Sequence, residues 1–271
     1  MRKLLNIGLG FCLYWAAVGF AATPIPVSIL CDEGYPPYSY GENGQALGLY
    51  SDILRAAFAR MPAYQVSIRP VPWKRGLLLL ERGSAFALYP PYLRQQERPW
   101  MDYSRAILEE KVVIFVNPTT TGGRALADFP AAYAGLRIGQ NAGFSVIHNP
   151  LFQQMLEHGQ LSLESGKDNR SNLLKFSLGR IDAYVNDRLS ALWTWQQLLR
   201  SGEIKPHASA VLVEGPTLSI EHGYLGFTNR DQGKFGYKAD FIRSLNAALV
   251  ELEREGVIEQ LSTGYSTSLA P

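Results

Sequence analysis

The tetrapeptide YPPY occurs twice in this chain, at residues 35–38 and 89–92. Tyrosine rings supply apolar contact and attract cations through their faces, and Arg94 behind the second copy adds a cationic group. The residues that flank the two copies differ completely, which argues against an internal duplication. The two copies are therefore either unrelated turns or two walls of one binding site.

No motif of metal, phosphate or nucleophilic chemistry accompanies them. The segment GFSVI does not match GxSxG, and TGGR is not a phosphate-binding loop. Cys12 lies in a segment that we expect to be removed, and Cys31 alone cannot form a cysteine-type zinc site. Neither HExxH nor any tight metal-ligand spacing is found among the histidines, which are His148, His158, His207 and His222. We therefore expect no metal, no cofactor and no catalytic residue.

The first half of the chain alternates apolar strands with amphipathic helices. Strands are predicted at residues 26–30, 64–71, 85–90 and 111–116, and helices at residues 52–61 and 73–82. Ser51 is the expected N-cap of the first helix, and Gly83 is expected to end the second. Strand, helix, strand, helix, strand is the order of a parallel sheet.

The second half repeats this alternation. Strands are predicted at residues 136–140, 180–186, 209–215 and 222–228. Helices are predicted at residues 122–135, 144–159, 168–179, 188–202 and 237–256. The order predicts two α/β lobes.

Each YPPY copy directly follows a predicted strand of the first lobe. In open α/β sheets, ligands bind beyond the carboxyl ends of the strands. We therefore expect both copies to stand on the same rim of the sheet.

Residues 1–21 have the pattern of a secretory signal peptide. Arg2 and Lys3 precede an apolar run of 17 residues that ends in small residues, as signal peptidase needs. We expect cleavage near Ala21 and a periplasmic protein. An uncleaved anchor is the alternative, because the run approaches the length that spans a membrane.

The charge of the chain is nearly balanced. It carries 26 basic and 24 acidic residues, and removal of Arg2 and Lys3 leaves 24 of each. A neutral surface gives no reason to expect nucleic acid or an anionic membrane as a partner. A mature chain of about 250 residues is long enough for two modest α/β units without a disulfide.

Six segments of the chain resemble, in the same order, the family 3 periplasmic solute-binding proteins of the amino-acid-binding type. They are GYPPYSYGENGQALGLYSDIL, VPWKRGLLLLERGSAFAL, ERPWMDYSRAILEEKVVIFV, LADFPAAYAGLRIGQNAG, LLKFSLGRIDAYVNDRLSAL and YKADFIRSLNAALVELEREGVIEQLSTGY. The resemblance covers nearly the whole mature chain. It implies two doubly wound α/β lobes that are joined by a two-strand hinge and close around a small polar solute.

On this basis, lobe 1 would comprise residues 22–113 and 217–271, and lobe 2 would comprise residues 114–216. The resemblance implies a non-catalytic, monomeric protein that captures an amino acid or a related compound. Its partner would be an inner-membrane ABC permease.

The resemblance also assigns binding residues. Tyr35 and Trp73 would sandwich the solute, with core or turn packing as the alternative. Arg98 would bind a carboxylate through its planar guanidinium, with a solvated surface charge as the alternative. Asp187 would accept an ammonium group, although the N-cap of the helix predicted at residues 188–202 would use the same carboxylate.

The chain departs from the family at the second YPPY. Pro90 and Pro91 stand where relatives carry hydroxyl residues, and proline has neither an N–H group nor a side-chain donor. Further candidate contacts are the side chains of Tyr89, Tyr92, Arg94 and Asn141 and the backbone near Gly143. An aromatic rim with arginine suits a modified amino acid, a small peptide-like compound or another organic acid as well as a standard amino acid.

Two other functions use the same scaffold. Periplasmic cyclohexadienyl dehydratases are similar in fold, and such an enzyme would need an acid placed against the leaving group. A ligand sensor would bind a membrane receptor instead of a permease. The docking faces carry no motif that separates a permease partner from a receptor.

Overall fold

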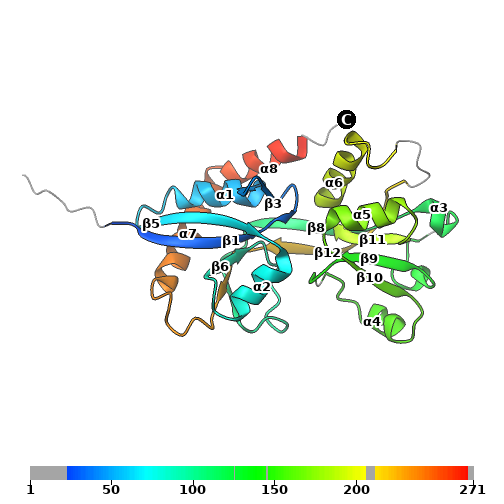
Figure 1. Cartoon of the computed structure of the whole chain (residues 1–271), viewed down its shortest axis with the longest axis horizontal. Helices are drawn as coiled ribbons and strands as arrows, with labels where there is room; N and C mark the ends of the chain where they lie inside the picture. Colours follow the sequence, from blue (N-terminus) through cyan, green and yellow to red (C-terminus); the bar gives the residue numbers. More distant parts are fainter. Residues whose placement is uncertain (1–22, 125, 145, 206–210, 268–271) are drawn as a thin grey trace, which may run out of the picture.

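A computed structural model describes residues 23–124, 126–144, 146–205 and 211–267. Two α/β lobes lie side by side along the long axis of the molecule, and two long strands, β8 (Leu108–Val116) and β12 (Val213–Gly223), run between them (Figure 1). This is the predicted fold class. The expected signal peptide, residues 1–21, lies outside the described residues. Within the described part, no helix has the length and apolar character needed to cross a membrane.

The sheet of lobe 1 has the strand order β5-β1-β6-β13-β7. Its strands are β5 (Tyr64–Val71), β1 (Ile25–Asp32), β6 (Ala87–Tyr89), β13 (Gly226–Thr228) and β7 (Met101–Tyr103). The first three are parallel, as predicted, whereas β13 runs antiparallel to both of its neighbours. Strand β1 is paired on both sides, and Val27, Ile29 and Cys31 on one of its faces are all buried in the core of the lobe.

The helices packed around this sheet in the described part are α1 (Leu49–Phe58), α2 (Trp73–Glu81) and α7 (Lys238–Arg254), and α8 (Val257–Thr267) packs on α1 and α7. The prediction that Ser51 caps α1 is wrong. Gly48 precedes the helix with a φ of 105°, and the buried Ser51 hydroxyl donates to the carbonyl oxygen of Leu47 at 3.0 Å. Helices α7 and α8 pack against α1.

A small hairpin sheet connects β1 to α1. Its strands are β2 (Gly34–Tyr35), β3 (Ser39–Glu42) and β4 (Gln45–Leu47). Asn43 and Gly44 both have positive φ values, 50° and 78°, which suits the two-residue turn between β3 and β4. The sequence predicts only turns here, because these strands are too short for a clear alternation of apolar residues.

The sheet of lobe 2 has the order β10-β9-β11-β8-β12. Its shorter strands are β10 (Ser162–Gly166), β9 (Arg137–Asn141) and β11 (Ala183–Asp187), and these three are mutually parallel. Strand β8 runs antiparallel to both β11 and β12. The predicted lobe boundaries at residues 113/114 and 216/217 fall within β8 and β12.

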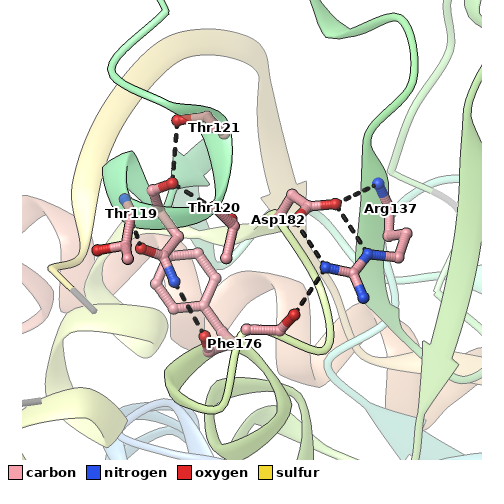
Figure 2. Close-up of polar contacts among 8 residues, drawn as sticks. Thr119, Thr120, Thr121, Arg137, Phe176 and Asp182 are labelled. Atoms are coloured by element: carbon pink, nitrogen blue, oxygen red, sulfur yellow. Dashed lines mark hydrogen bonds and ion pairs between the residues drawn. The ribbon is translucent and has the colours of Figure 1, made fainter. Parts of the chain in front are cut away.

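The helices of lobe 2 are α3 (Pro118–Thr121), α4 (Pro150–Glu157), α5 (Asn169–Ser177), α6 (Arg188–Arg200) and a 3₁₀ turn (Ala131–Tyr133). An ion pair fixes the start of β9 to the segment before β11 (Figure 2). The Oδ2 atom of Asp182 accepts hydrogen bonds from the backbone nitrogen and Nε of Arg137, both at 2.9 Å. The Nη2 atom of Arg137 donates to Asp182 Oδ1 at 2.8 Å and to the carbonyl of Gly179 at 2.6 Å. These bonds hold the first residue of β9 against the residue before β11, next to a parallel strand pair of lobe 2.

Candidate functional site

The two YPPY segments meet at one rim of the lobe 1 sheet. Strands β1 and β6 are parallel neighbours, with Cys31 opposite Tyr89, and each is followed by one copy. The hydroxyl oxygens of Tyr35 and Tyr92 lie 3.1 Å apart. The prediction that both copies stand on the same rim is confirmed.

A buried carboxylate lies behind this rim. Glu110 of β8 is 1% exposed, and its Oε2 accepts hydrogen bonds from Tyr35 at 2.5 Å and from Tyr92 at 2.6 Å. Its Oε1 accepts a hydrogen bond from Tyr50 of α1. Burial raises the pKa of Glu110, while the three tyrosine hydroxyls lower it and Glu221 raises it further. Three tyrosine hydroxyls donate to this one carboxylate, whose two oxygens offer about four acceptor positions, so Glu110 fixes both walls to a hinge strand.

The second hinge strand is also bound to the rim. Glu221 of β12 stands opposite Glu110 in the β8–β12 ladder. It forms an ion pair with Arg94, whose Nη2 lies 2.9 Å from Glu221 Oε1. The Arg94 guanidinium also lies over the Tyr92 ring, 5.6 Å from its centroid. The loop after β6 is thereby joined to both strands that connect the lobes.

A small pocket between the lobes contains Arg94 and four of the other predicted binding residues. It holds about 30 Å³ of space, and Tyr35, Trp73, Tyr92 and Arg98 are among its lining residues. The guanidinium of Arg98 lies 5.7 Å from the centroid of the Trp73 ring. The alternative of a solvated surface charge does not hold for Arg98, because only 8% of this residue is exposed.

Arg98 makes no ion pair with an acid of the described residues. The polar contact of its guanidinium is with the Gly143 carbonyl, at 3.4 Å from Nη2. Burial lowers the pKa of Arg98, which Tyr103 and Glu97 partly oppose. A buried guanidinium without a carboxylate partner can bind an anionic group. Because folding has already removed its charge from water, ligand binding requires little further desolvation of the guanidinium.

Lobe 2 fills most of this pocket with the loop after β9. The Phe144 ring lies edge-on to Tyr35 and to Trp73, with centroid distances of 5.6 and 6.2 Å. Gly143, at a φ of 84°, brings its carbonyl to Arg98, and a Cβ added there would meet Trp73 Cδ1 at 3.4 Å. Since 3.4 Å is an ordinary van der Waals distance, it is the positive φ that favours glycine at this position.

Asp187 lies at the lobe interface, where it caps α6. Its Oδ1 accepts from the Ser190 backbone nitrogen at 2.8 Å, and its Oδ2 accepts from the Lys111 backbone nitrogen at 3.2 Å. The Tyr38 side chain of lobe 1 also donates to this carboxylate. Burial and the nearby Glu110 raise the pKa of Asp187. The helix cap considered from the sequence is therefore present, and Tyr38 makes it a contact between the lobes.

Two other predicted residues lie outside this pocket. Tyr89 is fully buried in the core of lobe 1, where its hydroxyl is 2.8 Å from the Ser51 hydroxyl. Asn141 belongs to a buried network in lobe 2, in which its Oδ1 accepts from Asn172 and Tyr184, both at 2.9 Å. The structure thus separates Tyr89 from the four clustered residues, whereas Asn141 and Trp73 both line a second, larger cleft.

A larger cleft of about 730 Å³ opens beside the pocket, between β1, α2 and lobe 2. Trp73 and Phe144 line both spaces and therefore stand between them. The charged residues of the cleft are Asp32, Glu33, Asp168, Lys74 and Lys167, so its charges nearly cancel. Burial raises the pKa of Asp32 to about 7, a hydrogen bond from the Gly34 nitrogen lowers it, and Glu33 and Asp168 raise it.

Sequence reasoning missed Glu110 and Phe144. Glu110 is two residues before Val112 and four before Ile114 on the same face of β8, which is a signal of an inward-facing acid. Phe144 is an aromatic residue in the turn-rich segment GQNAGFS, but nothing in that segment shows which way it points. Among the described residues, no group of three or more histidine, cysteine or acidic side chains could hold a metal ion.

Comparison with known proteins gives the family context. The profile described as bacterial extracellular solute-binding proteins, family 3, matches residues 27–268. No curated protein matches the sequence significantly.

Solved structures share the fold at low identity. An ancestral arginine-binding protein bound to arginine is 17% identical with a TM-score of 0.70, over 89% of this chain and 97% of the other. A structure concerning glutathione import through GshT and the cystine ABC importer TcyBC of Streptococcus mutans is 18% identical, with a TM-score of 0.69 over 90% and 95% of the two chains. A histidine kinase sensor domain with similarity to periplasmic binding proteins is 15% identical, with a TM-score of 0.68 over 89% and 96%.

Proposed function

Because the chain belongs to the family 3 bacterial extracellular solute-binding proteins, we propose that it captures a small polar or zwitterionic organic solute between its two lobes. The solute is an amino acid or a related organic acid, and the protein delivers it to an ABC permease in the inner membrane. Residues 1–21 direct export to the periplasm and are cleaved near Ala21. The chain binds its solute without chemical conversion.

The observation that carries this proposal is the buried guanidinium of Arg98, which forms no ion pair with an acid of the described residues. Its guanidinium lies at the lobe interface beside Trp73, and no acid of the described residues forms an ion pair with it. A solute carboxylate there would form charge-assisted, bidentate hydrogen bonds, which are about twice as strong as neutral ones. Tyr35, Trp73 and Tyr92 supply the apolar walls around the body of the solute.

Contacts between the lobes support capture by closure. Tyr38 of lobe 1 donates to Asp187 of lobe 2, and the Ser190 hydroxyl of lobe 2 donates to the Pro36 carbonyl of lobe 1. Both contacts join the two lobes, and an opening of the lobes would break them. A solute that contacts both lobes adds its binding energy to the closed state and shifts the population toward it.

A thermal-shift screen of the purified mature protein tests the proposal. The panel comprises amino acids, organic acids, small peptides and polyamines. A solute at 100 times its dissociation constant stabilises the protein by about 2.7 kcal/mol. Trp73→Ala should weaken the response to a solute that binds, and the surface variant Arg75→Ala, on the same helix, should not. A panel without any stabilising solute would contradict the proposed function.

Two further measurements separate transport from the alternatives. The bound solute should be recovered chemically unchanged after prolonged incubation, and conversion would identify an enzyme. Cells that lack the protein should lose uptake of the labelled solute. Normal uptake with loss of a transcriptional response to the solute would identify a sensor.

A further inference from the structure

Lobe 2 presents Phe144, Val146 and the Gly143 carbonyl oxygen to the lobe 1 side of the pocket. The Phe144 ring meets Tyr35 at an interplanar angle of 83° and Trp73 at 78°. The neighbouring Gly143 carbonyl is the acceptor for Arg98. With both groups in place, about 30 Å³ remains, so a solute ring can enter only if Phe144 leaves.

The Phe144 ring and the Gly143 carbonyl indicate which chemical groups the pocket can bind. Edge-to-face contacts with two aromatic rings favour a ring at this position. The guanidinium favours an oxygen acceptor, but the Gly143 carbonyl is neutral and lies at 3.4 Å. A carboxylate makes shorter bonds of about 2.8 Å to a guanidinium and adds charge attraction. A molecule that joins an aromatic ring to a carboxylate therefore offers both groups with a stronger bond to Arg98.

The described lining of the pocket offers no acidic partner for an α-ammonium group. Its charged residues are Arg94 and Arg98. The two acids near its tyrosine walls already accept hydrogen bonds: Glu110 from three tyrosine hydroxyls, and Asp187 from Tyr38 and two backbone nitrogens. An ammonium group would lose its hydration next to two guanidinium groups without gaining a partner.

We propose that this pocket binds an aryl carboxylate that lacks an α-amino group, and that the ligand displaces the Phe144 ring and the Gly143 carbonyl. This inference rests on the proposed solute-binding function and names the class of solute. The ring takes the place of Phe144 between Tyr35 and Trp73, and the carboxylate takes the place of the Gly143 carbonyl at Arg98. After its displacement, Phe144 lies beside the larger cleft, whose wall it already forms.

Titration calorimetry with four matched compounds tests the class of solute. The compounds are 3-phenylpropanoate, L-phenylalanine, 2-phenylethylamine and 3-cyclohexylpropanoate. We expect 3-phenylpropanoate to bind at least about tenfold more tightly than L-phenylalanine, which corresponds to about 1.4 kcal/mol. The cyclohexyl compound should bind more weakly than the phenyl compound, and the amine should not bind.

The outcomes separate this inference from the proposed function. Tighter binding of L-phenylalanine than of 3-phenylpropanoate overturns the inference. The inference is also overturned if a non-aromatic solute binds through Arg98 while 3-phenylpropanoate and L-phenylalanine both fail to bind. That result would still support the proposed solute-binding function. Failure of every solute in the broad panel would overturn both.

The variant Phe144→Ala tests the displacement. Removal of the competing ring should increase the affinity for 3-phenylpropanoate several-fold, whereas the surface variant Leu151→Ala in the same lobe should leave it unchanged. Thermal melts of both variants establish that they are folded. An unchanged or lower affinity in Phe144→Ala would show that the ligand does not replace this ring.

Discussion

The hydroxyl oxygens of Tyr35 and Tyr92 lie 3.1 Å apart, although the residues are separated by 57 positions in the chain. Both hydroxyls donate to Glu110, which lies on a strand that connects the lobes. The two aromatic walls of the pocket are therefore attached to the hinge through one carboxylate. This geometry links the shape of the pocket to the position of the lobes.

Glu110→Gln should destabilise the protein by about 1–3 kcal/mol, because the amide replaces one oxygen acceptor with an NH₂ group that faces tyrosine hydroxyls. Urea denaturation at pH 7 measures this change. Glu109→Gln is the matched control, since Glu109 is the preceding residue on β8 and its side chain is 67% exposed. Equal stabilities of the two variants would show that the tyrosine bonds to Glu110 contribute nothing.

Asp32→Asn should become more stable than the wild type as the pH rises. The folded pKa of Asp32 is about 7, above its ordinary value of 3.8, so between these values the folded state binds more protons than the unfolded state. The contribution of Asp32 to the free energy of unfolding is thus fully present below about pH 4 and is lost as the pH rises through about 7. At about 1.4 kcal/mol per pKa unit, the advantage of the variant reaches at most about 4 kcal/mol at pH 8.

Unfolding free energies of the wild type and Asp32→Asn between pH 4 and 8 measure this effect. Glu42→Gln, at an exposed residue of β3, serves as the control. Parallel pH profiles for the wild type and Asp32→Asn would mean that Asp32 has an ordinary pKa in the folded protein.

Asp182→Asn should destabilise the protein by about 1–3 kcal/mol at pH 7, because it weakens the bonds from Arg137 shown in Figure 2. Burial raises the pKa of Asp182, but the hydrogen bonds from Arg137 lower it, so that the pKa lies below its ordinary value. The stability that it contributes is therefore present above about pH 4 and is lost as the pH falls. Chemical denaturation at pH 7 and pH 3 should show a smaller difference between variant and wild type at pH 3, with the exposed Asp128→Asn as control.

Tyr38→Phe should alter the choice between an acid and its α-amino analogue. Loss of the hydroxyl frees an acceptor site on Asp187, so the preference for 3-phenylpropanoate over L-phenylalanine should fall several-fold. Calorimetry with both compounds measures the ratio, and Tyr64→Phe, which removes a hydroxyl bound to Asp240, is the control. An unchanged ratio in Tyr38→Phe would show that Tyr38 does not exclude the ammonium group.

The fold was largely predictable because long apolar strands and amphipathic helices carry strong periodic signals. Strand β5, for example, has the predicted bounds. Strand β10 was missed because it is mostly exposed at the sheet edge and lacks an apolar run. Helix α8 was also missed, because the last predicted helix ends at Gly256. The N-cap of α1 is Gly48 and not the predicted Ser51, because Ser51 is buried against Tyr89 by tertiary packing.

The site was predictable only in part. The clustering of the YPPY copies follows from two parallel strands, which the alternation of elements indicates. The position of Phe144 depends on how a loop of lobe 2 meets lobe 1, which no local pattern encodes. The bonds from Tyr38 to Asp187 and from Tyr50 to Glu110 likewise join residues that only the tertiary structure brings together.

The central claim is that Arg98 binds the carboxylate of the solute between the lobes. Calorimetry with a solute identified in the screen should therefore compare the wild type with Arg98→Ala, Arg98→Lys and the surface control Arg75→Ala. We expect Arg98→Ala to lose at least about 30-fold in affinity, or roughly 2 kcal/mol or more, and Arg98→Lys to recover only part of it, since lysine lacks the planar fork. Arg75→Ala should bind like the wild type. Wild-type affinity in a folded Arg98→Ala protein would contradict the account.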